Sequence, residues 1–135
     1  MDQPIASLNV LLASMEPTLH PGVFAYCVVP LGADLSALSP VATVSESEGL
    51  TLVLPEEQAI AAGLSVLFRA AWITLTVHSD LQAVGLTAAF ASALGQAGVS
   101  CNVVAGAFHD HIFVPLDQAE PAMSALKALQ AASTP

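Results

Sequence analysis

Strong bases are almost missing from this sequence. Among 135 residues only Arg69 and Lys127 are strongly basic, against eleven acidic residues, and the formal net charge is −9. A nucleic-acid-binding protein gains most of its affinity from Lys and Arg placed near phosphates. An anionic membrane surface attracts proteins in the same way. The composition therefore excludes nucleic acid as a partner and argues against a membrane surface.

Cysteine is scarce as well. Cys27 and Cys101 are too few for a disulfide framework. The opening "MDQPIASLNV" lacks the basic segment that begins a secretory signal peptide. We therefore expect a reduced, cytoplasmic protein.

Uninterrupted hydrophobic runs long enough to span a membrane are absent. The run 59–77 carries Arg69 near its centre, at a cost of about 2.5–3.5 kcal/mol for insertion. The uncharged run 83–108 is broken by "GQAG" at 95–98. Both runs are typical of buried core segments rather than membrane spans.

Apolar residues are what the chain has in abundance. They make up 55% of it, and charged residues only 10%, where about 25% is usual. With so little charge to cover the surface, some apolar area must stay exposed, and such area marks interfaces. We predict an ordered protein that forms a homo-oligomer, most simply a dimer.

Hydrophobic patterning predicts alternating strands and helices. Strands are expected at 7–15, 23–29, 41–49, 50–55, 64–77, 99–108 and 111–115. Three helices are expected. The first spans 56–63, the second follows a capping-box pattern formed by Ser79 and Gln82, and the third begins at Asp117. The second helix should bury Leu86, Phe90, Leu94 and Ala97 and end at Gly98.

An internal repeat links the two halves of the chain. A shift of sixty positions aligns Val44 with Val104 and Pro55 with Pro115, and three further identities follow in the next helix. Both copies end a hairpin at a proline and enter a helix. The repeat predicts a two-part protein.

The segment "WITLTVHSDLQAVGLTAAFASALGQAGVSCNVVAGAFHDHIFVP" (72–115) resembles the ACT domain, a small ferredoxin-like module that binds amino acids or related metabolites. The first half, "LLASMEPTLHPGVFAYCVVP" with "EGLTLVLP", is similar to the partner half of small bacterial tandem-ACT proteins of unknown function. The resemblance implies an α+β fold with two antiparallel ferredoxin-like halves. Residues 1–63 would form a degenerate half and residues 64–135 a βαββαβ domain.

The resemblance also implies a ligand site and a function. Effectors of ACT domains bind where modules meet, against a glycine-containing loop that here corresponds to residues 78–86. The implied ligand-binding residues are His78, Ser79, Leu81, Gly85, Leu86, Asn102 and Asp110. The function implied is a non-enzymatic regulatory module for a small molecule of the amino-acid class, with no cofactor.

Other interpretations of these residues remain open. Asp110 could simply support a hairpin turn, and Gly85 could serve backbone geometry alone. A metal site would need a third ligand, such as His78, beside His109 and His111, and His20 is distant in sequence. The acidic segment "SESEG" (45–49) fits a solvated hairpin end or a weak cation site.

These interpretations lead to two other possible functions. The chain could be a structural or protein-docking homo-oligomer that binds no ligand. It could also be a small metal- or thiol-dependent enzyme that uses the histidines and Cys101, although a catalytic thiol needs an activating base and exposure.

Overall fold

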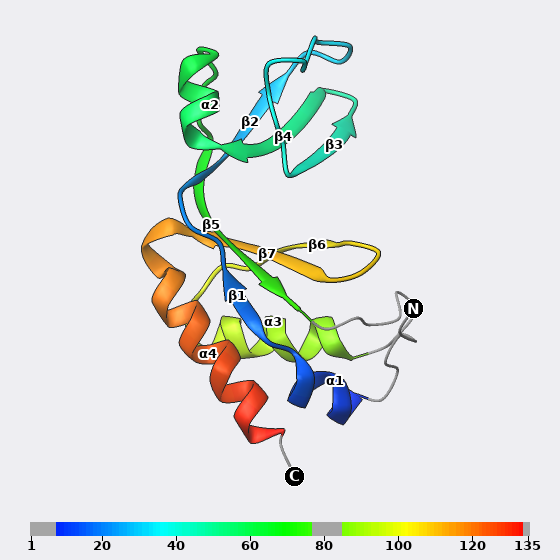
Figure 1. The fold of residues 1–135 in the computed structure, drawn as a ribbon, viewed down its shortest axis with the longest axis vertical. Helices are drawn as coiled ribbons and strands as arrows, with labels where there is room; N and C mark the ends of the chain where they lie inside the picture. The colour runs from blue at the N-terminus through cyan, green and yellow to red at the C-terminus, as the bar shows by residue number, and fades with distance from the viewer. Residues whose placement is uncertain (1–7, 77–84, 134–135) are drawn as a thin grey trace. The chain divides into compact units, whose positions relative to one another are not determined.

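The computed structural model describes residues 8–76 and 85–133. The chain forms two compact units (Figure 1). Unit 2 is the continuous stretch Pro21–Ala71, and unit 1 combines residues 1–20 with residues 72–135. The compact units are therefore not consecutive halves of the chain. The division into residues 1–63 and residues 64–135 stays a prediction.

Unit 2 is a four-stranded antiparallel sheet with one short helix. Its elements are β2 (Phe24–Val29), β3 (Ala42–Glu46), β4 (Gly49–Pro55), α2 (Glu56–Ala61) and the beginning of β5 (Phe68–Leu75). The strand order is β3-β4-β2-β5, and α2 packs against β2 and β4. Residues 30–41 connect β2 to β3 through turns, without a helix. The standard ACT pattern has a helix at this point. Its absence agrees with the prediction that the first half is degenerate.

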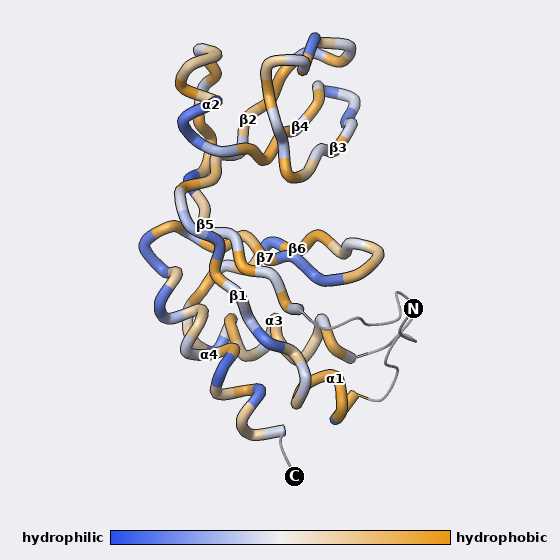
Figure 2. Tube along the Cα trace, in the orientation of Figure 1, coloured by the Kyte–Doolittle hydropathy of each residue, from blue (hydrophilic) through white to orange (hydrophobic). Residues whose placement is uncertain are grey.

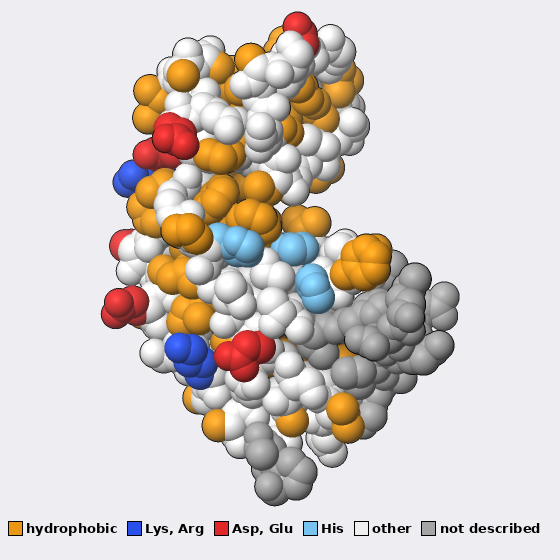
Figure 3. All heavy atoms as spheres, viewed as in Figure 1, with side chains coloured by type: hydrophobic (Ala, Val, Ile, Leu, Met, Phe, Trp, Pro, Cys, Tyr) orange, Lys and Arg blue, Asp and Glu red, His pale blue; other side chains and the backbone are white. Residues whose placement is uncertain are grey.

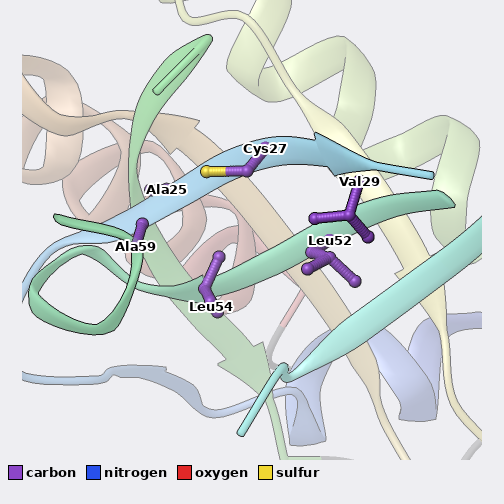
Figure 4. Packing of buried hydrophobic residues seen from close by; sticks show 6 residues of the cluster. All are labelled: Ala25, Cys27, Val29, Leu52, Leu54 and Ala59. Carbon is purple, nitrogen blue, oxygen red and sulfur yellow. The ribbon is translucent and has the colours of Figure 1, made fainter. Parts of the chain in front are cut away.

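The core of unit 2 is built from small and branched side chains. Figure 4 shows them between the two central strands and the helix, with the Cys27 thiol among them. The cluster consists of Ala25, Cys27, Val29, Leu52, Leu54 and Ala59. Burial raises the pKa of Cys27, so this cysteine is a neutral core residue.

Unit 1 places three α-helices against a sheet. Its elements are α1 (Leu8–Ser14), β1 (Pro17–Leu19), the end of β5, α3 (Leu86–Gln96), β6 (Asn102–Ala105), β7 (Asp110–Pro115), a 3-10 helix (Leu116–Gln118) and α4 (Ala119–Ala132). The strand order is β1-β5-β7-β6, and α4 contacts α1, α3, β1 and β7. Leu86, Phe90 and Leu94 are buried on α3 as predicted, whereas the prediction is wrong for Ala97, which caps the end of the helix and is exposed. Gly98 follows with a φ of 76°.

The prediction of a strand at 7–15 is wrong. Residues 8–14 form helix α1, which packs against α3 and α4 and buries Leu11 and Leu12, with Met15 following. Figure 2 shows the hydrophobic character of this segment. A short apolar run fits a buried strand or a buried helix equally well, so its pattern alone does not distinguish the two structures.

Unit 1 takes its last strand from the beginning of the chain. Residues 72–135 supply the order strand, helix, strand, strand, helix, and the edge position beside β5 is filled by β1, with Pro17 opposite Leu75. The implied βαββαβ domain is thus completed by residues 17–19 rather than by a segment after α4. Strand β5 itself pairs with β2 through Phe68–Ala70 and with β1 through Ile73–Leu75.

The predicted repeat is present in the backbone. In the β3–β4 hairpin Val44 lies opposite Thr51, and in the β6–β7 hairpin Val104 lies opposite His111, each exactly sixty positions later. Pro55 and Pro115 then enter their helices with φ/ψ values of −54°/133° and −53°/138°. The two hairpins therefore share register as well as sequence, and Leu50 is the repeat counterpart of Asp110.

Two expectations about the surface can be compared directly with the structure. Strand β3 is solvent-exposed from Thr43 to Glu46, in agreement with a solvated hairpin end. In the described ranges, no helix has the length and hydropathy needed to cross a membrane.

Candidate functional site

The start of α3 presents backbone donors that the helix itself does not use. Gly85 precedes the helix in a left-handed conformation, with a φ of 106°, and its carbonyl accepts a hydrogen bond from the amide of Ala89 at 2.9 Å. The first N–H groups of any helix lack partners within the helix. No side chain caps this end within the part of the chain that the structure describes. Leu86 is buried beneath it, so its side chain anchors the helix and only its backbone can face a ligand.

Glycine is required at position 85 for two reasons. A φ of 106° is strained for any residue with a Cβ. A Cβ built there would also lie 3.1 Å from Cδ2 of Leu8, at the beginning of α1. Both local geometry and packing therefore explain Gly85, and a backbone approach to a ligand is compatible with them.

Asp110 is the first residue of β7 rather than part of the hairpin tip. The tip is closed by a hydrogen bond from the amide of Gly106 to the carbonyl of His109, at 2.9 Å. Asp110 follows this turn, pairs with Ala105 and is only 7% exposed. The interpretation of Asp110 as a turn-supporting tip residue is therefore wrong.

The pairing of β5 with β7 places Asp110 at one end of the sheet. Trp72 stacks on Phe113, and Thr74 bonds to His111, so contacts run in opposite order along the two strands. Because the two strands run in opposite directions, Asp110, the first residue of β7, lies toward the end of β5. In Figure 1 the end of β5 and the start of α3 lie on the same side of unit 1. The beginning of β7, which carries Asp110, and the start of α3 thus belong to one end of this unit.

Burial shapes the acidity of Asp110. Desolvation raises the pKa of its carboxyl above the ordinary value of 3.8, while the nearby His111 and His109 act in the opposite direction. Its charged form is therefore disfavoured inside the protein. A cationic partner would offset that cost, because an opposite charge nearby favours the ionised carboxylate.

The other predicted ligand-binding residues are placed as follows. Asn102 lies on β6, and its side-chain amide donates to the carbonyl of Phe113 at 3.2 Å. By strand alternation Asn102 shares the face of Phe113 and His111, whereas Asp110 faces the opposite side with Ile112. The structure does not bring Asn102 and Asp110 together. His78, Ser79 and Leu81, like the capping-box pattern, lie outside the described residues.

A second cluster on unit 1 was not predicted from the sequence. We name His20, Trp72, Thr74 and His111 the histidine network. His20 stacks on Trp72 with ring centroids 3.6 Å apart, and its Nε2 lies 2.7 Å from Oγ1 of Thr74. Nδ1 of His111 lies 3.0 Å from the same oxygen and 3.2 Å from Nε1 of Trp72. Figure 3 shows histidine side chains gathered on one face of unit 1.

Metal binding or thiol catalysis would use the histidines and Cys101. Among the described residues, no three His, Cys, Asp or Glu side chains are grouped to hold a metal ion. Cys101 is half-buried, and burial raises the pKa of its thiol, which works against the thiolate form. His78, the third histidine that both hypotheses use, is outside the described part.

Two surface cavities lie away from the predicted site. One of about 380 Å³ in unit 2 is lined by Pro21–Phe24 and Pro55–Glu57. The other, of about 300 Å³ in unit 1, lies between Leu19 and the α4 residues Glu120, Met123, Ser124 and Lys127. An acidic residue in the first turn of a helix complements its dipole, so Glu120 is explained without a ligand, whereas Lys127 lies in the middle of α4.

Comparison with known families decides what kind of fold this is. Two models, each described as an ACT domain, match residues 3–71 and residues 68–128. The chain belongs to the ACT-domain family. The predicted tandem arrangement and α+β class are therefore confirmed. Domains of this family are regulatory modules rather than catalysts.

Solved structures agree with the family assignment. A Vibrio cholerae protein of unknown function, described as a possible transport protein, is 50% identical, with a TM-score of 0.83 over 91% of this chain and 95% of that one. An Agrobacterium tumefaciens protein is 15% identical, with a TM-score of 0.68 over 86% and 89%. The regulatory subunit of aspartate kinase from Thermus flavus is 10% identical, with a TM-score of 0.64 over 86% and 98%. The last two likenesses concern the fold alone. No curated protein sequence is significantly similar to the chain.

Proposed function

We propose that this protein is a non-catalytic regulatory module whose ligand is a small molecule of the amino-acid class. Membership of the ACT-domain family supports the regulatory role. The observation that carries the proposal is the pairing of a buried carboxylate with a helix start at one end of unit 1. The first-turn amides of α3 suit a ligand carboxylate, and Asp110 suits a ligand ammonium.

Charge is the physical motive for this arrangement. Arg69 bonds to Glu56 through two nitrogens, so its positive charge is already matched. Most proteins have many Lys and Arg side chains that can bind a ligand carboxylate. In this chain, a ligand carboxylate depends far more on backbone N–H donors. The repeat counterpart of Asp110 is Leu50, which has no charge to offer an ammonium group. We accordingly assign the site to unit 1 and not to unit 2.

The proposal predicts that an amino acid stabilises the protein. At a hundred times its dissociation constant, a bound ligand should raise the free energy of unfolding by about 2.7 kcal/mol. Thermal unfolding with each of the twenty amino acids in turn measures this effect. Asp110→Asn should then weaken the active ligand by about 1.5–3 kcal/mol, roughly 10- to 100-fold in dissociation constant.

Asp117→Asn is the matched control for that variant. Asp117 is exposed in the 3-10 helix of the same unit, so the same chemical change there should leave the affinity unaltered. If none of the amino acids shifts the unfolding temperature, the ligand class is wrong. If a ligand binds wild type and Asp110→Asn equally well, the site is wrong.

We also propose that the protein is a homodimer. Large apolar side chains are exposed on both units, and those of unit 2 include Val28, Leu31, Val44, Ile60 and Leu67. Exposed apolar area of this kind favours association. Light scattering at micromolar concentration should give twice the monomer mass of 13.7 kDa, and a monomer mass would contradict the proposal. A dimer that binds no amino acid would favour the docking function instead.

A further inference from the structure

The hydrogen atoms of the histidine network can be assigned from its geometry. The indole Nε1 of Trp72 can only donate, so Nδ1 of His111 must carry a lone pair. The Thr74 hydroxyl, 3.0 Å from the same Nδ1, then donates to it as well. This leaves the Thr74 oxygen to accept from Nε2 of His20, at 2.7 Å. One arrangement satisfies all three contacts, and in it His111 is neutral and His20 carries a hydrogen on Nε2.

The His111 ring is held in place on its other edge. A Cβ built on Gly106 would lie 3.3 Å from its Nε2 and 3.4 Å from its Cδ2, so the ring lies close to the backbone of the β6–β7 turn. The Trp72 indole is likewise bounded by the stacked rings of His20 and Phe113. The network therefore has little freedom to accommodate an extra hydrogen by small rotations.

We propose that the histidine network is a proton-binding switch, in which a proton taken up from solvent at Nδ1 of His111 breaks the bond from Trp72 and reverses the bond with Thr74. The new N–H bond uses the lone pair that both donors share. The Thr74 oxygen has a second lone pair and can accept from the new N–H, whereas the Trp72 indole can only donate and loses its acceptor on His111. His20 can take a proton at Nδ1 without losing its bond to Thr74, so His111 is the switching group. This inference goes beyond the proposed ligand site and does not depend on it.

The surroundings of His111 shift the pKa of its imidazole. Burial is the main cause that lowers its pKa below 6.5, His109 lowers it further, and Asp110 opposes both. Burial, and then His111, lower the pKa of His20. Strand β6 carries no titratable residue, and β5 presents Trp72 and Thr74. Helix α4 packs on the opposite face of β7, the side of Ile112 and Val114, so Glu120 and Lys127 lie across the sheet.

The consequence is a folded state that responds to mild acid. The His111 ring is neutral when the network is intact, so the stability that its bonds provide is fully present above pH 6.5. That stability is lost as the pH falls below 6.5 and through the folded-state pKa of His111. Proton uptake would release the indole of Trp72 and loosen the end of the β5–β7 pairing, next to Asp110.

The chain is well suited to a direct test, because Trp72 is its single tryptophan. Trp72 emission should change in one transition between about pH 8 and about pH 5, with a midpoint below 6.5, while far-UV circular dichroism stays constant. NMR titration of the His111 imidazole should give the same midpoint, and the indole N–H resonance should move with it. A His111 midpoint at or above 6.5, or flat Trp72 emission while His111 titrates, would overturn the switch.

Two variants locate the proton. His111→Gln keeps an acceptor for the indole N–H but cannot titrate, so the emission transition should disappear. His109→Gln is the matched control, and the transition should persist there with a slightly higher midpoint, because His109 lowers the pKa of His111. An unchanged transition in His111→Gln would show that another group is responsible.

Discussion

Replacing Gly85 with valine is expected to abolish amino-acid binding. The new side chain would sit at the start of α3, where the proposed ligand carboxylate meets backbone amides. It would also force a β-branched residue to a φ of 106° and place its Cβ 3.1 Å from Leu8. The strain should lower the free energy of unfolding by about 1–3 kcal/mol. Calorimetric titration with the active amino acid, together with urea unfolding, measures both effects.

Gly98→Val separates the loss of a site from the loss of stability. Gly98 follows the other end of the same helix with a φ of 76°, and a Cβ there meets nothing within 4 Å. The variant should show a similar loss of stability and normal affinity. If Gly98→Val loses affinity as well, destabilisation explains the result. If Gly85→Val binds normally, the helix start is not the ligand site.

Phe90→Ala is expected to have the largest effect on stability. Phe90 lies in the middle of α3 and is fully buried, so truncation leaves a cavity as well as losing transfer free energy. Such substitutions cost about 3–5 kcal/mol, a large part of the 5–15 kcal/mol that holds a typical domain folded. The urea midpoint should fall sharply, and an unchanged midpoint would contradict the placement of this helix face.

Phe108→Ala is the matched comparison for that variant. Phe108 lies in the β6–β7 turn and is 60% exposed, so the same truncation removes little buried area. We expect a change within about 0.5 kcal/mol in the monomer. The contrast between two identical substitutions isolates burial as the cause.

The sequence was most informative where a pattern extended over many residues. The three- and four-residue spacing of Leu86, Phe90 and Leu94 identified the buried face of α3. The sixty-residue repeat identified two hairpins, which proved to share register. The first pattern reflects the periodicity of a helix, which backbone geometry fixes without help from distant residues. The second reflects the repetition of one hairpin-and-helix unit along the chain.

The histidine network shows where sequence reasoning reached its limit. His20 and Thr74 are 54 positions apart, and Thr74 and His111 are 37 apart. His109 and His111 suggest a metal site because they are close in sequence, whereas His20 is distant from both along the chain. Only the pairing of β1 and β7 on the two sides of β5 brings His20, Trp72, Thr74 and His111 together.

By itself, the sequence determined the tandem ACT architecture and the acidic and apolar character of the chain. It also predicted Gly85 and Asp110 as ligand-binding residues. These properties follow from composition, local spacing and family motifs. The tertiary structure decided that residues 8–14 form a helix, that residues 17–19 complete the sheet of unit 1, and that Asp110 is buried. Each of these depends on which distant segment covers an apolar or polar side chain, and a local pattern does not contain that information.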